Sequence, residues 1–146
     1  MARYVTTVST PQRAEDVFRY LADLRHLTEW DPGVRSVTQV SGDGGGPDSV
    51  FEVTVAAIGH DLALRYRTVQ FELGRSLTVQ AESKALVSVD RVTVVAEPEG
   101  CRVTYDAELT LRGPLALAGP LLGPPFRRIG DRASAGLRRV LDGTAS

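Results

Sequence analysis

The middle of the chain, from Val50 to Leu111, consists of segments in which apolar and polar residues alternate. The clearest is Cys101–Arg112, CRVTYDAELTLR, in which Val103, Tyr105 and Leu109 share one side and charged or hydroxyl residues share the other. Strict alternation is typical of a strand with one buried and one solvated face. A series of such segments joined by short turns predicts an antiparallel sheet.

About seven strands are expected in this sheet. Each predicted strand either alternates or is rich in β-forming residues, and Gly, Pro or charged residues bound it. The predicted strands cover residues 3–8, 34–40, 50–58, 61–73, 76–83, 86–97 and 101–112.

Two helical segments separate the first two strands. Residues 9–23 have an amphipathic pattern, in which Thr10 suits the N-cap and Pro11 suits the first helical position. A shorter helix is expected over residues 24–30. It ends before Pro32, because the residue that precedes a proline disfavours helix.

The C-terminal region begins with an apolar segment, residues 113–132, that Gly and Pro interrupt repeatedly. This segment is too broken to span a membrane, which takes about 20 apolar residues in a row. Apolar residues recur there at spacings of three and four, which predicts one long helix, kinked or interrupted around residues 120–125, that packs along the sheet. The apolar stripe consists of Leu115, Ala118, Leu122, Phe126, Ile129, Ala133, Leu137 and Val140.

Composition excludes several classes of protein. Of the 146 residues, 42 % are apolar and 24 % are charged, which is typical of a soluble globular chain, and residues 1–146 are expected to form a single domain. The net charge of −1 gives no sign of a nucleic-acid partner. A lone cysteine, Cys101, and two separated histidines, His26 and His60, offer no local metal site, and no cofactor is indicated. The N-terminus lacks the apolar run of a signal peptide, so we expect a cytoplasmic protein without a transmembrane segment.

The expected pairing of the strands places one carboxylate on the buried face. Short hairpin turns would set Val79 opposite Asp90, and a loop over residues 98–101 would set Val92 opposite Ala107. Asp90 is then the one polar residue expected on this face. An unpaired carboxylate in an apolar interior is costly, so Asp90 must reach the mouth of the interior, pair with a cation or be protonated.

The strand over residues 61–73 contains two conflicting alternations. Leu62, Leu64 and Tyr66 favour one face, whereas Val69 and Phe71 favour the other. A β-bulge between the two groups would reconcile them.

The face chosen by this strand decides where two arginines point. One choice turns Arg65 and Arg67 inward, close to Asp90. The other turns Tyr66 inward and leaves both arginines in solvent, and we favour it because an uncompensated buried arginine is expensive.

The order of elements and the stretch LADLRHLTEWDPGV, residues 21–34, resemble the START-like superfamily. In particular, they are similar to the bacterial polyketide cyclase/dehydrase and lipid-transport proteins. The specific part is a short helix that carries Trp30, followed by Asp31 and Pro32 before the second strand. The resemblance implies an α+β helix-grip fold, in which a curved antiparallel sheet wraps around a long C-terminal helix and encloses an apolar cavity.

The resemblance also implies three alternative functions. The first is the binding of a lipid, quinone or polyketide-like molecule in the cavity, and no redox cofactor or metal is then needed. The second is a cyclase or aromatase that uses Tyr66, Asp90 and Tyr105 for acid–base chemistry. Enzymes of this kind hold their substrate with a pocket arginine, and the matching position is Arg67 or Gln70, depending on the bulge. The third is a protein-interaction module, and a homodimer is an open alternative for the assembly.

The expected ligand-contacting residues lie on the inner face of the sheet, at the mouth and on the long helix. Trp30 has two interpretations, as a lining of the cavity mouth or as a plug between the short helices and the sheet. The predicted ligand-binding residues are Trp30, Phe51, Val53, Val55, Leu64, Tyr66, Val79, Asp90, Val92, Tyr105, Leu122, Phe126 and Ile129.

A movable cover is one interpretation of the broken segment after the last strand. Glycines lack side-chain contacts and prolines remove helical hydrogen bonds, so residues 113–125 suit a wall of low local stability. The glycine-rich loop over residues 41–49, with the turn at residues 30–33, would form the opposite lip. In the alternative interpretation, the prolines only shape the connection from the last strand to the helix.

Overall fold

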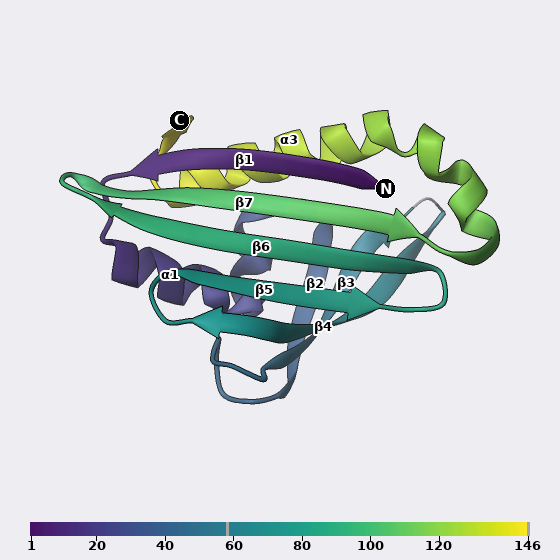
Figure 1. Ribbon diagram of the computed structural model, residues 1–146, viewed down its shortest axis with the longest axis horizontal. Coiled ribbons are helices and arrows are strands. Elements are labelled where there is room, and N and C mark those ends of the chain that lie inside the picture. The colour runs from purple at the N-terminus through teal and green to yellow at the C-terminus, as the bar shows by residue number, and fades with distance from the viewer. Residues whose placement is uncertain (58, 146) are drawn as a thin grey trace.

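The computed structural model describes residues 1–57 and 59–145. An antiparallel sheet forms most of the molecule, and a long C-terminal helix lies along its inner side (Figure 1). The strands, in chain order, are β1 (Ala2–Thr10), β2 (Val34–Ser41), β3 (Val50–Ala57), β4 (His60–Glu72), β5 (Ser76–Glu82), β6 (Leu86–Glu97), β7 (Gly100–Leu111) and the short β8 (Thr144–Ala145). The predicted strand over residues 50–58 is confirmed as far as Ala57, and Ile58 lies outside the described residues.

The strands follow one another as a meander from β2 to β7, and β1 then closes the sheet beside β7. β8 adds two residues to the free side of β1. The sheet curves strongly, so that β2 and β3 run across the direction of β5, β6 and β7 (Figure 1). The helices are α1 (Ala14–Ala22), η1 (Leu24–His26), α2 (Leu27–Trp30), η2 (Gly113–Leu121) and α3 (Gly123–Val140). This is the helix-grip α+β fold that the resemblance implied.

The turn between β6 and β7 is tighter than the sequence suggested. Glu97 pairs with Gly100, so Val92 lies opposite Tyr105 and Asp90 lies opposite Ala107. The predicted pairing of Val92 with Ala107 was therefore wrong by two residues. Gly100 permits the tight turn, because its φ of +146° favours glycine and because a Cβ there would collide with the carbonyl oxygen of Thr10. A shift of two residues keeps every side chain on the same face, so the predicted inner face was nevertheless right.

The predicted β-bulge in β4 is confirmed. The pairing of β4 with β5 shifts between Thr68 and Gln70, and the change of register lets Phe71 pack against the core although it breaks the alternation. Tyr66 is buried, whereas Arg67 is exposed on the outer face. The strand therefore adopts the favoured arrangement, in which both arginines are in solvent.

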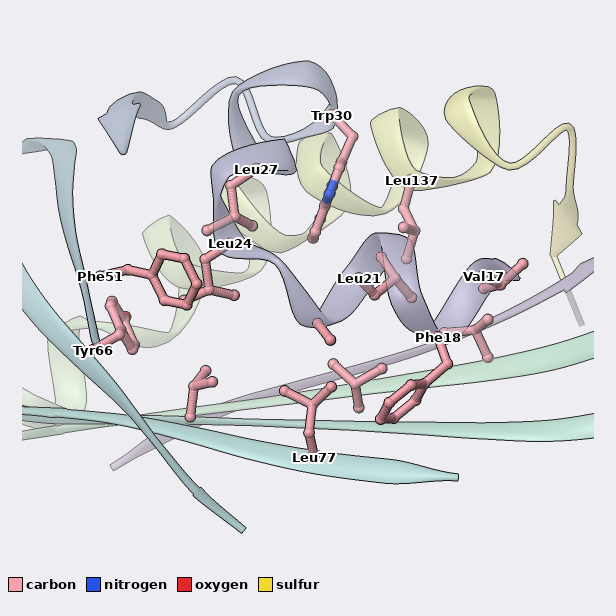
Figure 2. Close-up of a cluster of buried hydrophobic side chains, with 14 of the residues drawn as sticks. Val17, Phe18, Leu21, Leu24, Leu27, Trp30, Phe51, Tyr66, Leu77 and Leu137 are labelled. Carbon is pink, nitrogen blue, oxygen red and sulfur yellow. The ribbon is translucent and has the colours of Figure 1, made fainter. Parts of the chain in front are cut away.

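The core lies between the inner face of the sheet and the helices. Figure 2 shows Leu24, Phe51 and Tyr66 gathered on one side of it, and Val17, Phe18 and Leu21 on the other. Helix α1 contributes its apolar stripe as predicted, although it begins at Ala14 rather than at Pro11. Thr10 does not cap this helix. Its hydroxyl instead accepts a hydrogen bond from the amide of Gln12 and donates one to the carbonyl of Leu141.

The C-terminal region divides into two helices of different character. In η2 no residue is buried, and Leu117 and Leu121 are 88 % and 76 % exposed. The predicted stripe is therefore wrong before Leu122, because Gly and Pro give this part a 3-10 turn instead of an α-helical face. Helix α3 packs on β1 and on α2, and it approaches α2 so closely that a Cβ on Gly136 would collide with the carbonyl oxygen of Trp30. Within the described residues, no helix is both long enough and apolar enough to cross a membrane.

Candidate functional site

Four polar side chains lie together on the concave face of the sheet. Tyr66 comes from β4, Ser88 and Asp90 from β6, and Tyr105 from β7. Their positions follow from the pairing, because Tyr66 and Ser88 both lie opposite Ala81 of the intervening strand, and Tyr105 lies opposite Val92, two residues beyond Asp90. We call these four residues the inner polar cluster.

The cluster consists of two hydrogen-bonded pairs. The hydroxyl of Tyr105 donates to Oδ2 of Asp90 at 2.9 Å, and the hydroxyls of Tyr66 and Ser88 lie 2.6 Å apart. Diagonal neighbours on one face of antiparallel strands are within reach of long side chains, which explains the first pair. Both pairs hold hydroxyl groups at fixed positions in otherwise apolar surroundings.

Asp90 is the titratable centre of this cluster. Burial raises the pKa of its carboxyl to about 7; the hydrogen bond from Tyr105 opposes this effect, and the nearby Asp31 and Asp106 add to it. Burial likewise raises the pKa of Tyr105 and of Asp31. The sequence left three possibilities for Asp90: that it reaches the mouth of the interior, pairs with a cation or is protonated. The structure does not pair it with a cation. Its hydrogen-bond partner is a tyrosine hydroxyl, because Arg65 and Arg67 point away.

One oxygen of Asp90 remains available. Its Oδ1 accepts no hydrogen bond from the described residues, yet it is not among the fully enclosed side-chain atoms that lack a partner. Asp90 and Tyr105 both keep part of their surface exposed, as do three apolar neighbours on β7, Ala107, Leu109 and Leu111. The cluster and its neighbours on β7 are therefore not completely enclosed.

One buried hydroxyl lies beside the cluster without a partner. Among residues 1–57 and 59–145, Oγ1 of Thr68 is the fully enclosed side-chain oxygen that makes no hydrogen bond. Thr68 pairs with Val79, and Val79 pairs with Asp90, so the three residues form one row across the sheet. An unsatisfied buried hydroxyl is energetically unfavourable, so Thr68 is a local weak point of the core.

Trp30 is buried, with 5 % of its surface exposed, where α2 meets α3. Its ring meets that of Tyr105 edge-on, with centroids 5.5 Å apart and an interplanar angle of 75°. Figure 2 shows its side chain reaching from α2 toward the sheet, between Leu27 and Leu137. Trp30 thus fills the junction between the short helices and the sheet, and it also contacts the inner polar cluster.

The other predicted contact residues fall into two groups. Phe51, Val53, Leu64, Val79 and Val92 are buried on the inner face, whereas Val55, Leu122 and Phe126 are partly exposed. Their contact with a ligand stays a prediction. Arg67 and Gln70 are both exposed, and Gln70 bonds to Ser76 and Thr78, so neither supplies the pocket arginine or its substitute that the resemblance implied.

Ile129 is placed differently from the expectation that it would be buried against the sheet. Its side chain is 50 % exposed. At this turn α3 directs Gly130 at β1, where a Cβ would collide with the ring of Tyr4, so the preceding residue lies about 100° away around the helix. A charge at position 129 would therefore not be buried, and an Ile129→Asp substitution should cost little stability.

Sequence reasoning omitted two residues of the site. Ser88 lies two positions from Asp90 on the same strand, so alternation already placed it on the inner face. Asp31 was expected as part of the stretch that carries the family resemblance and of a turn, and it does accept a hydrogen bond from the amide of Gly33 at 2.9 Å. Its closeness to Asp90 depends on how α2 packs over the sheet, which no local pattern reveals.

The glycine-rich loop that was expected to form the opposite lip is packed at its base, and its role as a lip stays a prediction. The loop over residues 42–49 packs against α1, since a Cβ on Gly45 would collide with the backbone of Ala22. The turn between β5 and β6 lies beside the start of η2, because the amide of Arg112 donates to the carbonyl of Ala85 at 2.8 Å.

Asp90 lines neither of two surface pockets, each of about 420 Å³. The first lies between α1, the 42–49 loop and the β4–β5 turn, over Phe18 and Phe71. The second lies between α2 and α3, and Trp30 and Asp31 line part of it. Within the described residues, no three His, Cys, Asp or Glu side chains are grouped to hold a metal ion.

Comparison with known proteins gives one family match. The sequence profile of the family described as polyketide cyclase/dehydrase and lipid transport matches residues 1–142. No curated protein matches the chain.

Several solved structures resemble this one. A START superfamily protein from Mycobacterium smegmatis is 13 % identical, with a TM-score of 0.77 over 96 % of this chain and 97 % of that chain. Zhui aromatase/cyclase from Streptomyces sp. R1128 is 15 % identical, with a TM-score of 0.72 over 96 % of this chain and 91 % of that one. A protein from Thermus thermophilus is 18 % identical, with a TM-score of 0.73 over 96 % of this chain and 95 % of that one. At such identities the likeness shows the fold alone.

Proposed function

This chain belongs to the polyketide cyclase/dehydrase and lipid transport family, and from that premise we propose that it binds a small hydrophobic or amphipathic molecule between the concave face of the sheet and α3. The apolar part of the ligand contacts the partly exposed inner residues of β7 and the first turns of α3. Its polar group contacts the inner polar cluster. The ligand is a lipid, a quinone or a polyketide-like compound.

The observation that carries this proposal is the available oxygen of Asp90. A carboxylate held on the concave face without a protein cation is costly, and proteins retain such groups mainly where they serve a ligand or a reaction. The surrounding inner face is apolar and partly accessible, which suits a site with a few polar groups in a hydrophobic lining.

Helix η2 supports the proposal as a movable cover. Its three large apolar side chains, Leu115, Leu117 and Leu121, are between 49 % and 88 % exposed, although burial of such side chains is normally favourable. We propose that η2 moves over the bound ligand and buries part of this surface. Without ligand, η2 is held only weakly, because its prolines have no amide hydrogen to donate to a helical hydrogen bond.

A plugging substitution tests the location of the site. Ala107 is a small inner-face residue opposite Asp90, so Ala107→Trp would fill the space beside the cluster. Nile red, a neutral apolar dye, should bind the wild-type protein and bind Ala107→Trp at least about tenfold more weakly. Thr93→Trp, on the exposed outer face of β6, is the matched control and should bind as the wild type does. Equal binding by both variants would place the dye elsewhere and overturn the proposal.

A second candidate function is proton-transfer catalysis of the cyclase type. The contact that favours it is the hydrogen bond from Tyr105 to Asp90, since a carboxyl group with a pKa of about 7 suits a general base. Asp90 would remove a proton from the methylene group between two carbonyls of a poly-β-ketone chain. With a poly-β-ketone thioester, the wild type should form a cyclised product and Asp90→Asn should lose this activity. Equal product from both would exclude Asp90 as the base.

A further inference from the structure

The inner face offers acidic and hydroxyl groups but no cation among the residues that the structure describes. Around Asp90 the polar atoms come from the inner polar cluster, and Thr6, which pairs with Tyr105, adds a hydroxyl that lies 2.7 Å from the hydroxyl of Ser134 on α3. Asp31 lies near enough to raise the pKa of Asp90. A bound molecule therefore meets hydrogen-bond acceptors and a carboxyl group on this side.

No arginine of the described residues makes an ion pair with Asp90, although Arg138 of α3 reaches the same side of the sheet and donates to Ser134, which bonds to Thr6 beside Tyr105. Arg91 follows Asp90 directly, but its side chain points outward and lies 3.3 Å from Glu108. On the neighbouring strands, Arg65 pairs with Glu52 in the same way. Apart from Arg138, which bonds to Ser134, every arginine of this chain is exposed, and so is Lys84. His26 stacks on Tyr20 and His60 is exposed.

The alternation of side chains along β6 determines where Asp90 points. Because side chains of β6 point to opposite faces in turn, Arg91 must face solvent when Asp90 faces inward. Among the described residues no cation lies within 4.0 Å of the Asp90 carboxylate, so this carboxylate is free to pair with a positive group of a ligand. The Oδ1 atom of Asp90 is accessible and accepts from no donor of the described residues.

Resting on the proposed function, we infer that this site selects an apolar molecule that carries a basic amine, whose ammonium group binds Asp90, and that it excludes anionic amphiphiles such as fatty acid carboxylates. The ammonium group supplies the cation that the concave face lacks. A carboxylate ligand would instead place a second negative charge beside Asp90 in an environment of low dielectric, where like charges repel strongly. Hydrogen bonds that involve a charged group are also stronger than neutral ones.

Three decyl compounds that differ only in the polar group test this inference. Decylamine, decanol and decanoate are titrated at pH 8, below micellar concentrations, and the fluorescence of Trp30 reports binding because Trp30 contacts Tyr105. Decylamine should bind at least about tenfold more tightly than decanoate, with decanol between them. The net charge of −1 is too small for a general attraction to cations to explain such a difference.

Two variants assign the preference to Asp90. Asp90→Asn should bring the affinities for decylamine and decanoate to within about threefold of each other, while the affinity for decanol changes little. Glu52→Gln removes one negative charge from the outer face and should keep the wild-type preference. If Asp90→Asn fails to fold, the relative affinities of the wild type for the three compounds still test the inference.

The outcomes separate this inference from the proposed function. If decanoate binds as tightly as decylamine, or if Asp90→Asn keeps the preference for the amine, the inference is overturned while ligand binding stands. If none of the three compounds binds and Nile red does not bind either, the proposed function fails and the inference fails with it.

Discussion

The ring of Trp30 meets the ring of Tyr105 edge-on, with centroids 5.5 Å apart, and the hydroxyl of the same tyrosine donates to Asp90. Tyr105 thereby joins α2 to the inner polar cluster. Because Trp30 is the one tryptophan in the chain, its fluorescence reports on this cluster. A change at Asp90 reaches it through a single intervening side chain.

Substitution of Tyr105 by Phe should separate the two roles of this residue. The ring contact with Trp30 is kept, so the melting temperature should fall by only a few degrees, whereas Asp90 loses its hydrogen-bond donor, which is worth about 1 to 2 kcal/mol. The fluorescence response of Trp30 to decylamine should persist with a changed affinity. If Tyr105→Phe neither changes the affinity nor alters the pH dependence of stability, the hydrogen bond has no role in the site.

Asp90→Asn should stabilise the protein at neutral and alkaline pH. Asp90 has a folded-state pKa of about 7 against an ordinary value of 3.8, so the folded state holds the proton more tightly than the unfolded state. Its contribution to stability is fully present below pH 4 and is lost as the pH rises through 7. The variant should therefore gain on the order of 4 kcal/mol over the wild type between pH 4 and pH 8, measured by urea unfolding.

A carboxylate of opposite behaviour is the control for this measurement. Asp106 bonds to Arg3 at 2.7 Å on the outer face, and that hydrogen bond lowers the pKa of Asp106. Its contribution is present above its ordinary pKa and is lost as the pH falls, so Asp106→Asn should destabilise at pH 7 and have little effect near pH 3. A wild-type stability that rises between pH 4 and pH 8 by an amount that Asp90→Asn does not alter would show that Asp90 titrates normally.

Thr68→Val should raise the stability of the fold. The hydroxyl of Thr68 is enclosed and unpaired, and valine replaces it with a methyl group of the same shape, so the expected gain is about 1 kcal/mol. The same substitution at Thr10 is the control, because that buried hydroxyl makes two hydrogen bonds and its loss should be destabilising. Thermal unfolding of both variants decides. A loss of stability in Thr68→Val would mean that a bound water satisfies this hydroxyl.

Gly136→Ala should destabilise the protein although alanine is the better helix former. The added Cβ would collide with the carbonyl oxygen of Trp30 and force α3 away from α2. The expected loss is roughly 2 kcal/mol or more, against the gain of about 1 kcal/mol that alanine brings in an open helix. Gly123, at the start of α3, has no neighbour within 4 Å of a Cβ, so Gly123→Ala should be neutral or slightly stabilising. Equal effects of the two substitutions would contradict the close packing at Trp30.

The inner face of the sheet could be predicted because alternation survives errors of register. The β6–β7 pairing was expected two residues away from its actual position, yet Asp90, Val92 and Tyr105 still point inward, since a side chain changes face only when a strand shifts by an odd number. The bulge near Thr68 was also predictable from alternation. Two apolar alternations in one strand cannot both face the core unless a bulge lies between them.

The parts that could not be predicted depend on contacts between distant elements. Ile129 fits a helical stripe, but Gly130 takes the contact with β1 because Tyr4 needs the room. The 42–49 loop has no local signal for its packing against Ala22. The closeness of Asp31 to Asp90 likewise arises only when α2 covers the sheet.

Hydrogen exchange with and without ligand tests the location of the binding site most directly. Without ligand, amides of η2 should exchange faster than those of α3 from Ile129 onward, because η2 buries no residue. When the most tightly bound of the three decyl compounds is added, exchange should slow in η2 and in β7 from Tyr105 to Leu111. It should stay unchanged in the 42–49 loop beside the first surface pocket. Slowing confined to that loop and α1, or no slowing in η2 and β7 at saturating ligand, would contradict a site between the concave face and α3.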